Sequence, residues 1–377
     1  MDFKGIFIDP DEYNLIEKDV GEGGFSKIQK VKNKNDDNEY VAKIISQSVN
    51  DEKIQINFMR EATILFNANH PAFVKLIGVS FRSLSDSDLY QPTIIMEYMP
   101  NGSLKEILDK EKNSIADAKW TPTKKYISLL GISSAMRFLH AHKIIHRDLK
   151  PGNVLIDENY YPKLCDFGLS KYDPDTFSDV TDLLNQTRDI GTPISMAPEM
   201  LNKEKYGPSL DVYSFGLLAF EIITNTQPFS EYEHSDPFVL YGKVLQGVRP
   251  KFVSDVPENM KILIEKCWDN DPNVRPTFDE IYKQLSTDLS HSPEDLDTGE
   301  IMAYLEMLES SQNNFILVSE KSFDIIKKNF QKVSDFLFFA CESNNIDLFK
   351  FLVSNQKIDF NQKIISIFIC ILFFFFF

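Results

Sequence analysis

Residues 146–153 read His-Arg-Asp-Leu-Lys-Pro-Gly-Asn, and residues 166–168 read Asp-Phe-Gly. A short apolar run with the composition of a strand lies between these two motifs. The spacing therefore predicts a polar loop, a strand and a tight turn in succession. An isolated Asp-Phe-Gly would be weak support, whereas two matched motifs at this spacing are strong support. The alternative interpretation is a solvated polar loop between two apolar segments.

The two motifs resemble the catalytic loop and the metal-binding turn of protein kinases. Phosphoryl transfer from ATP needs positioning and positive charge over the phosphate oxygens more than covalent help. The resemblance implies that Asp148 accepts the proton of the attacking hydroxyl and that Lys150 lies near the transferred phosphate. It also implies that Asn153 and Asp166 supply oxygen ligands to Mg²⁺, a hard cation. The candidate catalytic residues are Asp148, Lys150 and Asn153.

Length and composition narrow the class of protein. A chain of 377 residues suggests two or three domains, or one bilobal unit with an appendage. The hydrophobic fraction of 43% is enough for a substantial core, and a net charge of −16 argues against nucleic-acid binding. The four cysteines are scattered and have no zinc spacing, which predicts a reducing, cytoplasmic location. The N-terminus has no signal-peptide pattern.

The glycine-rich stretch at residues 20–28 predicts two strands joined by a turn. Glycines let backbone N–H groups approach phosphates closely, although a Gly-x-Gly alone is a common turn. The kinase resemblance makes this turn the lid over ATP, with Ser26 where the family has a third glycine. The candidate ATP-binding residues of the lid are Val20, Gly21, Glu22, Gly23, Gly24, Phe25, Ser26 and Ile28.

Residues 40–45 have strand composition and carry the lysine expected to grip the phosphates. Residues two apart on a strand share a face, so Val41 and Lys43 are predicted to face the nucleotide together. The resemblance implies that Val41 and Ile28 roof the adenine ring and that Leu155 forms its floor. Valine stands where the family usually has alanine, which narrows the adenine slot.

Helical spacing at residues 51–69 predicts a helix that carries the partner of the lysine. Glu61 is the candidate that pairs with Lys43 and holds it on the phosphates. Glu52 is the alternative, but it lies near the helix start, where acidic residues are favoured anyway.

Two further strands are predicted at residues 73–79 and 93–98. The resemblance places Met96 at the gatekeeper position beside the adenine pocket. It places Glu97 to Met99 in the hinge, with backbone groups facing the base.

The following segment is predicted to be mostly helical. Ser103 is a plausible helix cap, and a long helix is predicted at residues 126–142. His140 and His142 are predicted to be residues of the helix C-terminus and not metal ligands. Asp211 starts a strongly apolar helix. Asp211 is predicted to hold the backbone of the catalytic loop from below. The alternative is that it only caps the helix N-terminus, and it could also do both.

Residues 168–191 form a polar loop that resembles an activation segment. Arg147, beside the catalytic aspartate, needs an anion, so phosphorylation is predicted in this loop, with ordinary loop hydroxyls as the alternative. The candidate phosphosites are Thr187 first, then Ser178 and Thr181. Glu199 and Arg275 are predicted to form a buried ion pair.

Together, residues 20–278 resemble a eukaryotic protein kinase of the tyrosine-kinase-like group, while Lys150 and Thr192 resemble serine/threonine-specific enzymes. The resemblance implies an α+β, bilobal fold with a five-stranded antiparallel sheet and one helix, then a mostly helical lobe, and ATP and Mg²⁺ between them. The predicted domain covers residues 13–289. The predicted function is serine/threonine phosphorylation of protein substrates; a pseudokinase scaffold is the alternative, and tyrosine specificity is a weaker one.

The remaining chain is predicted to be an appendage. Residues 290–332 form an acidic linker with short helices, and residues 333–377 resemble one ankyrin repeat, which would offer a surface to a protein partner. An unrelated helical hairpin is the alternative. The apolar end at residues 364–377 is too short for a membrane span of ~20 residues, so membrane association is not expected. A truncated or misread gene end is favoured over a buried helix or an interfacial anchor.

Overall fold

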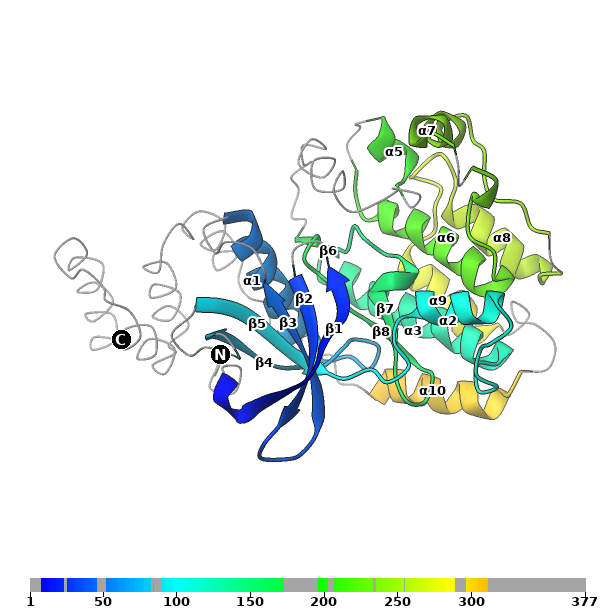
Figure 1. Ribbon diagram of the computed structural model, residues 1–377. Coiled ribbons are helices and arrows are strands. Elements are labelled where there is room, and N and C mark those ends of the chain that lie inside the picture. Colours follow the sequence, from blue (N-terminus) through cyan, green and yellow to red (C-terminus); the bar gives the residue numbers. More distant parts are fainter. Residues whose placement is uncertain are drawn as a thin grey trace, which may run out of the picture. The chain divides into compact units, whose positions relative to one another are not determined.

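The computed structural model describes residues 8–310, apart from 24–25, 46–51, 83, 85–89, 173–195, 203–205, 233–234, 254 and 289–295. The described residues fall into two compact units (Figure 1). The first unit is built from residues 8–67 and 75–98, and the second from 68–74 and 99–310. The predicted ankyrin-like segment and the apolar end lie outside the described residues.

The first unit is a five-stranded antiparallel sheet with one helix, as predicted. The strand order is β1-β2-β3-β5-β4, and the helix α1 contacts β4. The elements are η1 (Pro10–Glu12), β1 (Tyr13–Gly23), β2 (Ser26–Asn33), β3 (Glu39–Ile45), α1 (Glu52–Asn67), β4 (Leu76–Arg82) and β5 (Tyr90–Glu97).

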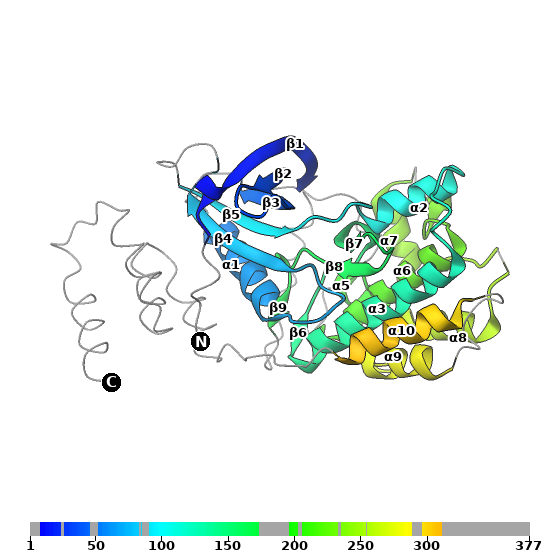
Figure 2. The same ribbon diagram turned by 90° about the horizontal axis from the view of Figure 1, so that it is seen from below.

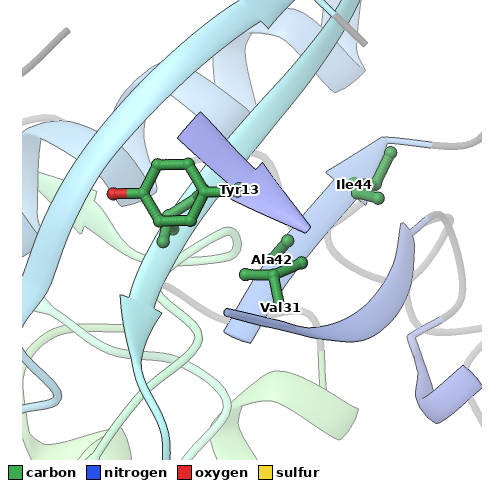
Figure 3. Close-up of a cluster of buried hydrophobic side chains, with 5 residues drawn as sticks. Tyr13, Val31, Ala42 and Ile44 are labelled. Atoms are coloured by element: carbon green, nitrogen blue, oxygen red, sulfur yellow. The ribbon is translucent and has the colours of Figure 1, made fainter. Parts of the chain in front are cut away.

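One face of this sheet is closed by an apolar cluster (Figure 3). Ala42 and Ile44 of β3 are buried in it, while Val41 and Lys43, which alternate with them along the strand, are only half-buried. Since strand side chains alternate between faces, Val41 and Lys43 lie on the opposite face, as the period of two predicts. The cluster consists of Tyr13, Val31, Ala42, Ile44 and Ile95.

The strand predicted from residue 73 begins three residues later, at Leu76. Phe73 forms an isolated bridge with Leu164 instead, and Val74 donates its backbone N–H to the Leu164 carbonyl at 3.1 Å. The apolar run is therefore continuous in sequence but divided between two different pairing partners, which its composition could not reveal.

The second unit is mostly helical, with two short two-stranded sheets, β6-β9 and β7-β8. Its elements are α2 (Leu104–Lys112), α3 (Pro122–Ala141), β6 (Ile144–Ile145), η2 (Pro151–Asn153), β7 (Val154–Ile156), β8 (Pro162–Leu164), β9 (Lys171–Tyr172), α5 (Pro198–Leu201), α6 (Ser209–Thr224), η3 (Ser230–Tyr232), α7 (Pro237–Leu245), α8 (Glu258–Cys267), α9 (Phe278–Thr287) and α10 (Thr298–Ser310).

Local capping fixes where the helices of this unit begin. Ser103 forms the predicted cap of α2, a reciprocal capping box with Glu106. The helix α3 starts at Pro122, earlier than predicted, because Thr121 caps the Lys124 N–H and proline is favoured in the first turn. Pro208 occupies the cap position of α6, so Asp211 lies within the first turn and the N-cap interpretation was wrong.

Two buried helices organise the second unit. The helix α6 is buried on nearly all sides and contacts α8 and α3, while α3 contacts α9, α10 and β8. Figure 2 shows α10 running along α3. In the part of the chain that the structure describes, no helix is long and apolar enough to cross a membrane.

Candidate active site

In the first unit, Lys43 and Glu61 form a close ion pair. The Lys43 Nζ atom is 2.7 Å from both carboxylate oxygens of Glu61. The glutamate side chain is only 5% exposed, and that of the lysine 17%. The helix α1 brings Glu61 to the strand β3, so the structure joins the two side chains that the sequence paired.

Strand register gathers further candidates on the same face as Lys43. Ile28 lies directly opposite Lys43 on the neighbouring strand, and Met96 directly opposite Val41. Directly opposite residues of antiparallel strands point to one face. Ile28, Val41, Lys43 and Met96 therefore share the face opposite the apolar cluster.

The glycine-rich candidates lie at the end of the β1–β2 ribbon. Gly21 pairs with Ile28, Glu22 with Lys27 and Gly23 with Ser26. Val20 lies within β1, and Ser26 is buried at the start of β2. Gly24 and Phe25 lie outside the described residues.

The remaining adenine candidates are divided between the two units. Glu97 ends β5 in the first unit, and its carboxylate accepts the Lys75 N–H at 2.7 Å. Met99 is buried in the second unit, where its carbonyl accepts the Gly102 N–H at 3.2 Å. Leu155 lies in β7 of the second unit and bridges to Ser103.

In the second unit, the side chains of Lys150 and Asn153, two of the three candidate catalytic residues, converge on the third, Asp148. Its Oδ2 atom accepts from Lys150 Nζ at 2.7 Å and from Asn153 Nδ2 at 2.8 Å. The Asn153 amide also donates to the Asp148 carbonyl at 2.7 Å. Because the amide nitrogen makes these bonds, the amide oxygen of Asn153 is the atom suited to a cation.

The two candidate metal ligands are held at one end of the β7–β8 hairpin. Asn153 directly precedes β7, and Asp166 follows β8 by two residues. The Cys165 N–H donates to the Asn153 carbonyl at 3.0 Å, which ties the two loops together. Asp166 has a left-handed backbone, with φ of 59°, which is uncommon for a residue other than glycine.

This donor set fits Mg²⁺. An amide oxygen and a carboxylate are hard oxygen ligands, and Mg²⁺ takes one or two carboxylates together with phosphate and water. Among the described residues, no group of three or more His, Cys, Asp or Glu side chains could hold a metal by itself. A cation here would therefore need oxygens from a bound phosphate.

Asp211 supports the catalytic loop from the buried helix α6. Its two oxygens accept the backbone N–H groups of His146 and Arg147, each at 2.8 Å, and Oδ2 also lies 2.9 Å from His140 Nε2. Burial acts to raise the pKa of Asp211, but these hydrogen bonds and the nearby histidines hold the pKa below its usual value. Arg147 has φ of 67°, so the aspartate stabilises a strained backbone.

His146 lies fully buried between the loop and the following turn. Its Nδ1 accepts the Asp148 N–H at 3.3 Å, and its ring meets the Phe167 ring edge-on at 5.3 Å. Within the described residues, the Nε2 atom has no hydrogen-bond partner. Burial lowers the pKa of His146 against the pull of three nearby carboxylates, which favours the neutral ring.

The Arg147 side chain contacts two residues of the second unit. Its Nε donates to the Leu169 carbonyl at 2.5 Å, and Nη1 donates to the Tyr206 hydroxyl at 3.2 Å. The predicted phosphosites Ser178, Thr181 and Thr187, and also Thr192, lie outside the described residues.

Glu199 and Arg275 form the predicted buried ion pair. Two parallel bonds of 2.8 and 2.9 Å join the guanidinium to the carboxylate. Arg275 also donates to the carbonyls of Asp269 and Ser209, so it ties α5 to the start of α6. Bidentate geometry and extra acceptors are what a buried pair needs to offset desolvation.

Sequence reasoning missed two supporting residues. The sequence predicts His140 only as a helix-terminal residue, yet it bonds to Asp211, and no sequence motif marks Tyr206, which contacts Arg147. Neither contact has a signal in sequence spacing, because the partners lie 71 and 59 residues away.

Comparisons with known proteins agree with this arrangement. The family model described as protein kinase domain matches residues 14–285. The dual specificity protein kinase shkB of Dictyostelium discoideum is 34% identical over 279 residues, covering 72% of this chain and 39% of that protein. A probable serine/threonine-protein kinase of the same organism is 32% identical, covering 72% of this chain and 19% of that protein.

A third relative is viral. The putative serine/threonine-protein kinase/receptor R831 of Acanthamoeba polyphaga mimivirus is 33% identical over 247 residues, covering 65% of this chain and 14% of that protein. The chain thus spans well under half the length of each of these three relatives.

Proposed function

The chain belongs to the protein kinase family, and on that premise we propose that it transfers the γ-phosphoryl group of ATP to serine and threonine hydroxyls of protein substrates. The observation that carries the proposal is the Asp148 carboxylate, held by Lys150 and Asn153 and supported through the backbone by Asp211. The names of two of the relatives above, which print serine/threonine-protein kinase, support the same substrate class.

In the proposed mechanism, Asp148 accepts the proton of the attacking hydroxyl. Its contact with Lys150 supports a role for that positive charge beside the transferred phosphate, where charge would develop on the oxygens. Asn153 and Asp166 would hold Mg²⁺, which supplies charge neutralisation to the phosphates when bound. Lys43, fixed by Glu61, would hold the phosphates of ATP beneath the glycine-rich turn.

Transfer of radiolabelled phosphate tests this proposal. The intact chain should transfer labelled phosphate to itself or to a mixed protein substrate when ATP and Mg²⁺ are present. This transfer should stop when Mg²⁺ is chelated. Asp148→Asn keeps the shape but removes the base, and we expect a loss on the order of 100-fold or more. Full transfer by this variant would disprove the mechanism.

Phosphoamino-acid analysis of the labelled product tests the substrate class. We expect phosphoserine and phosphothreonine. Phosphotyrosine in addition would instead match the name of the relative that is called dual specificity. A chain that binds ATP but transfers none would be a pseudokinase scaffold, although Lys43, Asp148 and Asp166 are all in place.

We also infer the finer assignments from the sequence. Asp-Val-Tyr-Ser-Phe-Gly at residues 211–216, and the stretch from Cys-Trp to Arg-Pro-Thr-Phe at residues 267–278, resemble the tyrosine-kinase-like group and support that assignment. The resemblance of residues 333–377 to an ankyrin repeat supports a protein partner. Cys165 and Cys267 are free thiols, which supports a reducing, cytoplasmic location. Phosphorylation near Arg147 is part of the same proposal, with Thr187 as the first site to examine by mass spectrometry.

A further inference from the structure

We propose that α10 braces the β7–β8 hairpin and that Tyr304 is a positioning residue for Asn153 and Asp166. This inference rests on the function proposed above, because it concerns the two residues assigned to Mg²⁺. The helix begins at Thr298, beyond the end of the family match at residue 285. The helix therefore lies outside the matched residues, and it contacts α3 and, through Tyr304 and Glu300, the Tyr161 side chain just before β8.

Tyr304 is the central contact of the brace. Its side chain is buried, and its ring lies 4.7 Å from the ring of Tyr161, the residue just before β8. A Cβ atom added at Gly131 of α3 would collide with the Tyr304 hydroxyl and with Cγ of Pro162. The tip of Tyr304 thus fits between α3 and the first residue of β8, where only a glycine leaves room.

A charged contact ties the first turn of α10 to the same hairpin. Lys124 of α3 forms a salt bridge with Glu300 and also donates to the Asn159 carbonyl at 2.6 Å in the β7–β8 turn. Tyr161 donates its hydroxyl to Glu300 at 3.3 Å. One lysine and one glutamate therefore join α3, α10 and the hairpin.

The hairpin is a short connection from the brace to the two metal ligands. In its register, Ile156 pairs with Pro162 and Val154 with Leu164. Pro162, which Tyr304 supports, is only four residues before Asp166. A shift of β8 would also disturb the Cys165 bond to the Asn153 carbonyl, so both ligands would move.

The ring of Tyr304, rather than its hydroxyl, carries this role. The hydroxyl oxygen is buried and has no hydrogen-bond partner among the described residues. Removing an unpartnered buried polar group is close to neutral or stabilising, whereas removing the ring leaves a cavity. Tyr304→Phe should therefore keep the brace, and Tyr304→Ala should release it.

Hydrogen exchange on the full chain gives a readout independent of catalysis. In Tyr304→Ala, amide exchange across residues 153–166 should accelerate, while exchange in α8 should stay as in the wild type. Tyr304→Phe should match the wild type. Met302→Ala is the matched control, because Met302 lies on the same helix but is 57% exposed.

Gly131→Ala provides a second variant in case Tyr304→Ala does not fold. Alanine favours the helix α3, so a faster exchange in residues 153–166 would come from the displaced Tyr304 side chain and from Pro162, which the new methyl group also meets, and not from lost helix propensity. In steady-state assays, both variants should need about tenfold more Mg²⁺ or higher for half-maximal rate, as when supporting partners of metal ligands are lost.

Two results would overturn the proposal that α10 holds the β7–β8 hairpin. One is unchanged exchange across residues 153–166 in Tyr304→Ala and Gly131→Ala; the other is an equal acceleration in α8, which means general loss of stability. Failure of the proposed function looks different: the wild type would transfer no phosphate at all, while the exchange data would still decide whether α10 holds the hairpin.

Discussion

At the scale of single residues, the Lys43–Glu61 pair makes the most direct prediction. The Glu61 side chain is almost fully buried, so removal of the lysine leaves a carboxylate without its closest cation. We expect Lys43→Met to lower the free energy of unfolding by about 3 kcal/mol, measured by urea denaturation.

The double variant Lys43→Met/Glu61→Met serves as the control for this prediction. Because it leaves no buried charge at the site, it should lose clearly less stability than the sum of the two single variants. Strict additivity of the three measurements would mean that the two side chains are not energetically coupled.

Glu61 shows how far residue-level prediction can reach. The kinase resemblance and the helical spacing of residues 51–69 predict it as the partner of Lys43, and the structure buries it in α1 together with Phe58 and Leu65. His140 shows where such prediction stops. Its bond to Asp211 depends on the packing of α3 against α6, which no local pattern encodes.

His70 predicts a pH dependence of stability. Its ring is buried, with Nε2 3.0 Å from the Ser134 hydroxyl and Nδ1 accepting the Ala72 N–H. Burial, with nearby positive charge, lowers the pKa of His70 from 6.5 to about 4. The unfolded chain therefore binds the proton more readily, and stability falls as the pH drops from 6.5 towards 4.

The expected loss from His70 is about 2 kcal/mol between pH 7.5 and pH 5, measured by urea denaturation at each pH. His70→Gln has no such group, so its curve should be flatter by this amount. The pKa of His146 is lowered as well, but His146 is present in both proteins, so its effect cancels when their two stability curves are compared. Parallel curves would show that His70 is not held neutral.

At the scale of elements, α6 is predicted to set the shape of the catalytic loop. In Asp211→Asn, an amide group would face a backbone N–H where a carboxylate oxygen now accepts. We expect a loss of about 1.5–3 kcal/mol in the free energy of unfolding. The value of kcat should fall more than about tenfold, because the loop carries Asp148.

Thr224→Ala is the control on the same helix. Thr224 donates to the Phe220 carbonyl at the far end of α6, away from the loop. This variant should lose some stability and keep kcat. An Asp211→Asn protein that keeps wild-type kcat would show that the loop holds its shape without the aspartate.

Most elements could be predicted from sequence, and the misses have physical causes. The period of two in β3 and the capping residue of α2 are local signals, and the structure confirms both predictions. The start of β4 was misplaced because residues 73–74 bond to Leu164, a distant partner. The predicted start of α3 is four residues late because the first turn has no apolar residue that continues the helical pattern, although Thr121 caps it.

At the scale of the whole molecule, the sequence predicted two units through motifs, yet it could not predict how far the second unit extends. One of the short helices predicted within residues 290–332 is α10, which packs on α3 through buried Ile301, Tyr304 and Leu308. The family motifs end before this helix, and the apolar residues of the helix do not indicate which element they pack against. Only the contacts assign it to the second unit.

The net charge of the chain predicts that salt weakens its use of basic substrates. The chain carries −16, so its field should attract basic protein substrates and repel acidic ones. Such attraction between solvated charges is screened as the Debye length shortens with salt. At saturating ATP and Mg²⁺, raising NaCl from about 50 to about 300 mM should lower kcat/KM severalfold for a lysine-rich serine peptide. A neutral peptide of the same length is the control and should change little, and kcat should hold for both because the chemistry itself is not screened. If the two peptides respond equally, the salt acts on the enzyme's stability or on ATP binding, and the overall charge of this chain plays no part in choosing its substrates.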